Sequence, residues 1–123
     1  MVPRRARILV VDDESRVCEL LREFLTIQGY DVATAAGGAE ALDAVPIFQP
    51  DVILVDMRMP GLSGRDFLDV LRQGGLTMPV VLMSGDSGKA GEGFFGILQK
   101  PFDLSRTAQL VAAAFAHTRN FEG

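Results

Sequence analysis

The stretch Val52-Ile53-Leu54-Val55-Asp56-Met57-Arg58-Met59-Pro60-Gly61 decides the fold that we expect. Its four consecutive branched apolar residues predict a strand that is buried on both faces, as in a parallel sheet. The apolar run stops at Asp56, and Pro60-Gly61 behind it predicts a turn. Ligands of open α/β sheets bind just beyond the carboxyl ends of the strands. Asp56 therefore stands where chemistry is expected.

The size and composition of the chain predict one soluble globular domain. It has 123 residues, of which 48% are hydrophobic and 23% are charged, and its formal net charge is −4. The negative charge argues against a nucleic-acid partner, as does the lack of a basic cluster along any helix beyond the short lead-in Arg4-Arg5-Ala6-Arg7. No apolar run is long enough for membrane insertion. The single cysteine, Cys18, and the absence of a signal-like segment at the start favour a cytoplasmic, reducing setting.

Short apolar runs alternate with stretches of helical period along the chain. We expect strands at residues 6–11, 30–35, 52–56, 80–84 and 97–99. We expect helices at residues 15–28, from Gly38 until Pro46, which a helix should not pass, at 63–73, and from about residue 103 until fraying after His117. Five glycines between positions 85 and 96 predict a loop with at most one helical turn.

Five strands alternating with helices predict an α/β fold with a doubly wound parallel sheet. The expected strand order is the flavodoxin-like 2-1-3-4-5. We expect a ragged N-terminus over residues 1–5, one domain over residues 6–117, and a tail over residues 118–123 whose final Glu-Gly resembles a cloning scar. Such a chain is compatible with a domain taken from a longer protein.

The predicted strand order brings five polar side chains to one edge of the sheet. Asp12 and Asp13 follow the first strand and Asp56 ends the third, while Ser84 and Lys100 end the fourth and fifth. Three close carboxylates repel one another, and a hard divalent cation such as Mg²⁺ relieves the repulsion. With such a cation Asp56 can act as a nucleophile toward a phosphoryl group, with Lys100 as a second cation and Ser84 as a hydroxyl donor.

These motifs resemble those of the response-regulator receiver domain of two-component signalling. The matching segments are Asp12-Asp13, Val55-Asp56-Met57-Arg58-Met59-Pro60-Gly61, Ser84-Gly85 and Lys100-Pro101-Phe102. The resemblance implies that Asp56 accepts a phosphoryl group from a histidine of a histidine kinase or a histidine phosphotransfer protein.

The resemblance also implies a role for each neighbour of the phosphoacceptor. Mg²⁺ would be held by Asp12, Asp13, Asp56 and the backbone carbonyl of Arg58, and the phosphate would be contacted by Ser84 and Lys100. A cis peptide bond before Pro101 is implied as well. Further domains of the full-length protein are a further expectation.

Three features depart from the family pattern. Ile97 stands where the family usually has an aromatic residue, so an aromatic rotamer switch is not expected. The glycine-rich loop replaces the family's fourth helix, which should be short or absent, as in receivers attached to hybrid histidine kinases. Arg58 and Asp86 occupy the two variable positions that flank the phosphate. Within the loop, Phe94 and Phe95 are expected to plug the sheet edge that the missing helix leaves bare.

Competing functions differ in the residues that they require. We expect a signalling module and not an enzyme, with no turnover beyond its own phosphorylation and dephosphorylation. The alternative is a Mg²⁺-dependent phosphohydrolase with an aspartyl-phosphate intermediate, but its general acid two residues after the nucleophile would here be Arg58. A flavin carrier would need a Ser/Thr-rich phosphate loop after the first strand, where this chain has Asp12-Asp13-Glu14. A receiver-like module that is never phosphorylated is the fourth possibility.

Overall fold

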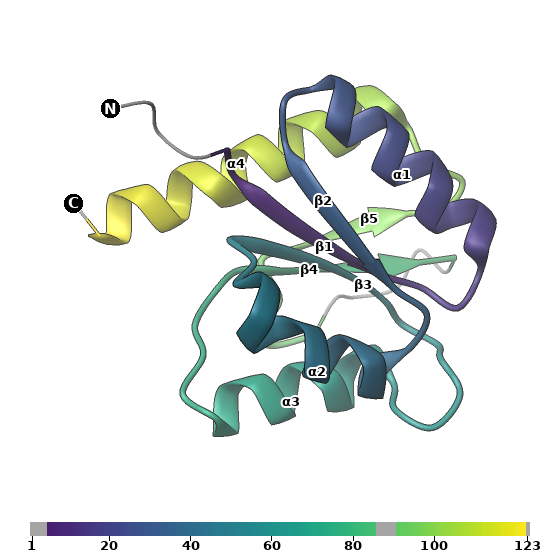
Figure 1. Ribbon diagram of the computed structural model, residues 1–123, viewed down its shortest axis with the longest axis vertical. Coiled ribbons are helices and arrows are strands. Elements are labelled where there is room, and N and C mark those ends of the chain that lie inside the picture. The colour runs from purple at the N-terminus through teal and green to yellow at the C-terminus, as the bar shows by residue number, and fades with distance from the viewer. Residues whose placement is uncertain (1–4, 86–90, 123) are drawn as a thin grey trace.

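A five-stranded parallel sheet forms the centre of the computed structural model, which describes residues 5–85 and 91–122 (Figure 1). The strand order is β2-β1-β3-β4-β5. This order confirms the flavodoxin-like, doubly wound sheet predicted from the sequence. The strands are β1 (Arg7–Val11), β2 (Asp31–Ala35), β3 (Val52–Asp56), β4 (Val80–Ser84) and β5 (Gly96–Gln99).

The two faces of the sheet are covered by different pairs of helices. The helices are α1 (Ser15–Ile27), α2 (Gly38–Phe48), α3 (Gly64–Gln73) and α4 (Leu104–Glu122). Helices α1 and α4 cover one face, and α2 and α3 cover the other (Figure 1). Within the described residues, no helix has the length and apolar character needed to cross a membrane.

The central strands are apolar on both faces because each face packs into its own core. Leu9, Ile53 and Leu82 lie in the core under α2 and α3. Ile8 and Leu54 lie in the core under α1 and α4. All five are at most 2% exposed, as expected for strands in the middle of a parallel sheet.

The strand register brings the carboxyl ends of the strands to one edge. Val11 pairs with Val55, and Asp56 pairs with Met83. Ser84 in turn pairs with Gln99. Residues that follow these positions therefore meet at one edge of the sheet, as the sequence predicted.

Helix α2 corrects one sequence-based expectation, because it passes Pro46 and ends at Phe48. A proline removes one backbone hydrogen bond of the preceding turn. Only two helical residues follow Pro46, so the loss falls in the last turn, while Ala41 and Val45 remain buried. The helix stops at Gln49, whose backbone is left-handed with a φ of 55° and whose N–H donates to the carbonyl of Val45.

Helix α4 corrects a second expectation, because it continues to Glu122 and does not end after His117. Its sequence contains neither glycine nor proline, so no backbone signal stops it. The hydroxyl of Thr118 also donates to the carbonyl of Ala114 at 3.2 Å, a side-chain hydrogen bond to the preceding turn. The domain limits themselves stay a prediction.

The connection between β4 and β5 is described only in part. Residues 86–90, including Asp86, lie outside the described residues, and residues 91–95 form no helix. Phe94 packs against the core under α2 and α3, and Phe95 packs against the other core. The two aromatic side chains thus pack against opposite faces of the sheet, and their expected role as a plug of the sheet edge stays a prediction.

Polar and aromatic contacts hold the same segment. The guanidinium of Arg65 on α3 lies 5.3 Å from the ring centroid of Phe94 and donates to the carbonyl of Glu92. The rings of Phe95 and His117 are 5.5 Å apart, and His117 is exposed.

Candidate functional site

The first acid of the site is fixed by the backbone at the end of β1. Asp12 is 1% exposed, and its N–H donates to the carbonyl of Ala35 at 3.1 Å. Its Oδ1 accepts a hydrogen bond of 2.9 Å from the N–H of Glu14. Asp13, the next residue, is exposed and faces the same pocket. One strand end thus supplies one buried and one exposed carboxylate.

Asp56 is the last residue of β3 and is 8% exposed. The chain after it is held by two backbone hydrogen bonds, from Met57 N–H to the carbonyl of Met83 and from Gly64 N–H to the carbonyl of Met57. The first turn of α3 therefore packs against the end of β3, which fixes the backbone from which the Asp56 carboxylate projects.

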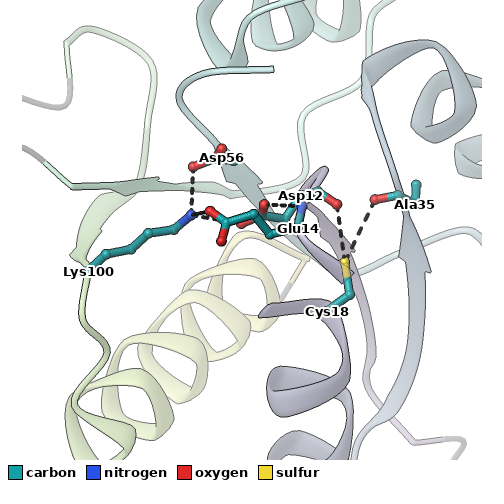
Figure 2. A network of polar contacts seen from close by, with 6 residues as sticks. All are labelled: Asp12, Glu14, Cys18, Ala35, Asp56 and Lys100. Atoms are coloured by element: carbon teal, nitrogen blue, oxygen red, sulfur yellow. Dashed lines mark hydrogen bonds and ion pairs between the residues drawn. The ribbon is translucent and has the colours of Figure 1, made fainter. Parts of the chain in front are cut away.

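Lys100 directly follows the carboxyl end of β5, and its side chain reaches the acids from there. Its N–H donates to the carbonyl of Ser84 at 2.7 Å, and the peptide bond to Pro101 is cis, as predicted. Its Nζ lies 3.0 Å from Asp12 Oδ2, 3.1 Å from Asp56 Oδ1 and 3.6 Å from Glu14 Oε1 (Figure 2). One ammonium group thus bridges three carboxylates.

The electrostatics of this cluster act in opposite directions on its members. Burial raises the pKa of Asp56; the hydrogen bond from Lys100 lowers it, while the charges of Asp12 and Asp13 raise it. The net effect is a pKa above the ordinary aspartate value. Burial lowers the pKa of Lys100, but its hydrogen bonds to Asp12 and Asp56 outweigh burial and raise the pKa overall. Lys100 therefore stays cationic. Its single positive charge does not balance the carboxylates around it.

The donor set fits a hard divalent cation. Carboxylate oxygens of Asp12, Asp13 and Asp56 all lie within 4.8 Å of one another. Mg²⁺ prefers oxygen ligands and keeps several waters, which suits an acid cluster with an exposed member. The position of the Lys100 ammonium between Asp12 and Asp56 indicates that positive charge is already favoured there.

The structure brings all six predicted site residues to one pocket region. A pocket of about 370 Å³ is lined by Asp13, Glu14, Asp56, Met57, Arg58, Ser84, Gly85 and Lys100. Asp12 lies beside this pocket and contacts Lys100 in its lining. Ser84 is 2% exposed, and its Oγ lies 3.8 Å from Sδ of Met57. The roles predicted for all six residues stay predictions.

Sequence reasoning missed two contributors to this network. Glu14 contacts Lys100, and the thiol of Cys18 on α1 lies 3.3 Å from the carbonyl of Asp12 (Figure 2). The one sequence signal for the contribution of Glu14 was its position directly after Asp12-Asp13. Cys18 lies one helical turn inside α1, and helical period alone predicts packing for it, with no contact to a particular carbonyl.

Comparison with known proteins identifies the family. Residues 8–112 match the sequence model of the response regulator receiver domain. The chain belongs to this family. Receiver domains are signalling modules of two-component systems, and they bind Mg²⁺ at an acidic pocket, which agrees with the cluster of Asp12, Asp13 and Asp56.

Relatives of this receiver domain include much longer proteins. The DNA-binding transcriptional regulator NtrC of Escherichia coli (strain K12) is 35% identical over 120 residues, which are 93% of this chain and 26% of that protein. The transcriptional regulatory protein KdpE of Mycobacterium tuberculosis (strain H37Rv) is 38% identical over 118 residues, which are 90% of this chain and 52% of that protein. The receiver domain thus spans about a quarter of one relative and about half of the other.

Solved structures match the fold over nearly the whole chain. A receiver domain from Clostridium thermocellum superposes with a TM-score of 0.87 at 31% identity, and the match covers 94% of this chain and 98% of that one. The chemotaxis protein CheY4 of Vibrio cholerae gives a TM-score of 0.85 at 27% identity. Both comparisons agree with the strand order described above.

Replacing Lys100 by methionine tests the electrostatic account of the site. Lys100→Met leaves Asp12 and Asp56 without their shared donor, so the free energy of unfolding without Mg²⁺ should fall by about 1–3 kcal/mol. Added Mg²⁺ should restore more stability to the variant than it adds to the wild type. Urea unfolding with EDTA and with Mg²⁺ measures both effects.

The exposed ion pair between Arg65 and Asp69 provides the control for this measurement. Both side chains are nearly half exposed, so Asp69→Asn should change the stability by less than about 1 kcal/mol. Equal, small losses in Lys100→Met and Asp69→Asn would contradict the account of Lys100 as the cation that balances the cluster.

Proposed function

We propose that this receiver domain is a phosphoacceptor that takes a phosphoryl group from a histidine of a histidine kinase or a histidine phosphotransfer protein onto Asp56. One observation carries the proposal. The Asp56 carboxylate lies in the wall of an open pocket, with a cationic Lys100 at 3.1 Å and two further acids beside it. A nucleophile, a fixed cation and a candidate metal site thus lie within reach of one phosphoryl group.

In the proposed step a carboxylate oxygen of Asp56 bonds to phosphorus while the bond from phosphorus to the donor imidazole nitrogen breaks. The imidazole nitrogen keeps the electron pair of that bond and takes up a proton from water. Lys100 neutralises charge on the transferred phosphoryl oxygens, and the Ser84 hydroxyl donates a hydrogen bond to one of them. Bound Mg²⁺ supplies further positive charge to the phosphoryl oxygens.

The residues proposed to hold Mg²⁺ are Asp12, Asp13, Asp56 and the backbone carbonyl of Arg58. The first three support this role by the closeness of their oxygens, and Arg58 supports it by lining the same pocket. We infer no small-molecule turnover, since the acid that a phosphohydrolase needs two residues after its nucleophile is here Arg58.

The longer relatives suggest how the signal leaves the domain. NtrC and KdpE are named as regulators of transcription. We infer that further domains of a longer protein, or a separate protein, read the phosphorylation state of this receiver domain. Phosphotransfer from a kinase would take place in the cytoplasm.

Intact-mass measurement tests the proposal. With Mg²⁺ and phosphoramidate, a small donor with a nitrogen–phosphorus bond, the chain should gain the mass of one phosphoryl group, and peptide mapping should locate that group on Asp56. EDTA should prevent the gain, because the carboxylates then repel the anionic donor. A chain that binds Mg²⁺ by calorimetry and gains no mass would overturn the proposal. Continuous release of phosphate over many turnovers would favour the phosphohydrolase instead.

A further inference from the structure

Glu14 occupies a helix-capping position that its side chain does not use for capping. It directly precedes α1 with extended backbone angles, φ −87° and ψ 111°, and its side chain makes no capping hydrogen bond. Residues at such positions commonly accept a hydrogen bond from the first turn of the helix. The Glu14 carboxylate instead lies 3.6 Å from Nζ of Lys100, and the residue lines the pocket of Asp56.

Lys100 has three ammonium N–H groups and three carboxylate neighbours. Asp12 and Asp56 are hydrogen-bond partners at 3.0 and 3.1 Å, and Glu14 is the third and most distant neighbour. A phosphoryl oxygen that reaches Lys100 has to compete with these carboxylates for the ammonium group. The Asp12 side chain is fully buried, and Asp56 is the group that carries the phosphate, whereas the Glu14 side chain is 66% exposed.

We propose that Glu14 restrains the Lys100 ammonium in the unphosphorylated domain and thereby slows phosphorylation of Asp56, most strongly by small anionic donors. The inference rests on the proposed phosphoacceptor function. Glu14 competes with the incoming phosphoryl group for Lys100, and its charge adds to that of Asp13 on the same pocket wall. Arg58 and Lys100 are the cationic residues that line this pocket. Glu14 is thus a positioning residue. It favours phosphodonors that gain binding energy from further contacts with the domain.

Phosphorylation rates of charge-matched variants test this role. At saturating Mg²⁺ with phosphoramidate as donor, Glu14→Gln should be phosphorylated about two- to fivefold faster than the wild type, the range expected from an ion pair whose carboxylate is largely exposed. Glu23→Gln, which removes the same charge from an exposed position of α1 outside the pocket, should keep the wild-type rate. The gain in Glu14→Gln should shrink at high ionic strength.

A shorter acid at position 14 distinguishes the effect of the contact with Lys100 from the effect of the negative charge. Glu14→Asp keeps the negative charge and loses one methylene of reach, so release of Lys100 should raise its rate toward that of Glu14→Gln. A wild-type rate in Glu14→Asp would overturn the restraint of Lys100, as would equal rates in Glu14→Gln and Glu23→Gln.

A second readout does not depend on phosphorylation. The chain has two lysines, Lys89 and Lys100, so ¹⁵N-labelled lysine gives two side-chain ammonium signals, which Lys100→Met assigns. The ammonium protons of Lys100 should exchange with water faster in Glu14→Gln than in the wild type and in Glu23→Gln. An unchanged exchange rate would overturn the inference. A wild-type chain that is not phosphorylated at all would instead contradict the proposed function, while the exchange rates would still decide the restraint.

Discussion

Asp56→Asn should abolish phosphorylation of this receiver domain, with no mass gain from phosphoramidate and Mg²⁺ under conditions that phosphorylate the wild type. Asparagine fills nearly the same volume at a position that is only 8% exposed, so the fold should be kept. Its amide has no anionic oxygen to bond to phosphorus. Among the acids that the site brings together, Asp56 alone ends the buried strand β3, beside Lys100 and facing the pocket.

The same substitution should make the metal-free domain more stable near neutral pH. Burial raises the pKa of Asp56 in the folded state above that in the unfolded chain. Ionisation of Asp56 therefore costs folding free energy: the cost is absent below the ordinary aspartate pKa and grows as the pH rises through the raised pKa. Asparagine does not ionise, so the stability advantage of Asp56→Asn should appear over this pH window. Urea unfolding in EDTA at a series of pH values measures it.

An exposed aspartate provides the control for both readouts. Asp43→Asn on α2 removes one negative charge from a solvent-facing position and should leave both phosphorylation and the pH dependence of stability as in the wild type. Full phosphorylation of Asp56→Asn would show that another residue is the phosphoacceptor. A variant whose stability falls relative to the wild type as the pH rises would contradict the raised pKa of Asp56.

The sequence predicts the positions of the strand ends better than the contacts of individual side chains. Runs such as Val52 to Val55 are apolar throughout because both faces of the sheet are covered, and their lengths fix where Asp56 and Lys100 emerge. Parallel register then brings these ends together with no need for side-chain detail. This is why all the predicted site residues meet at one edge.

The features that the sequence did not predict depend on tertiary contacts. Helix α2 continues two residues past Pro46, and Phe48 at its end packs against the core under α2 and α3. The contact of Glu14 with Lys100 depends on side-chain conformations and on residues 86 positions apart, which no local pattern encodes. Glu14 stands at the N-cap position of α1, but its side chain contacts Lys100 and makes no capping hydrogen bond.

Gly64→Ala should have the largest effect of any single methyl group added near the site. A Cβ at Gly64 would lie 2.7 Å from the carbonyl oxygen of Asp56, 3.0 Å from Cδ1 of Leu82 and 3.3 Å from Cα of Met57. Two of these neighbours are backbone atoms and the third is in the core, so either the first turn of α3 or the end of β3 has to move. We expect a loss of about 2–3 kcal/mol in the free energy of unfolding, as for other overpacked cores.

The displacement should also slow phosphorylation, because the end of β3 carries Asp56. A shift of the nucleophile relative to Lys100 by a fraction of an ångström to one ångström should lower the rate about tenfold to a hundredfold. Gly74→Ala at the other end of α3 is the matched control: its φ of −80° suits alanine, and the nearest atom to its Cβ would be 3.5 Å away. Gly74→Ala should therefore change the stability and the rate little. If Gly64→Ala lost stability and kept the wild-type rate, α3 alone would absorb the added methyl group, and the close packing of α3 on β3 would not be what positions Asp56.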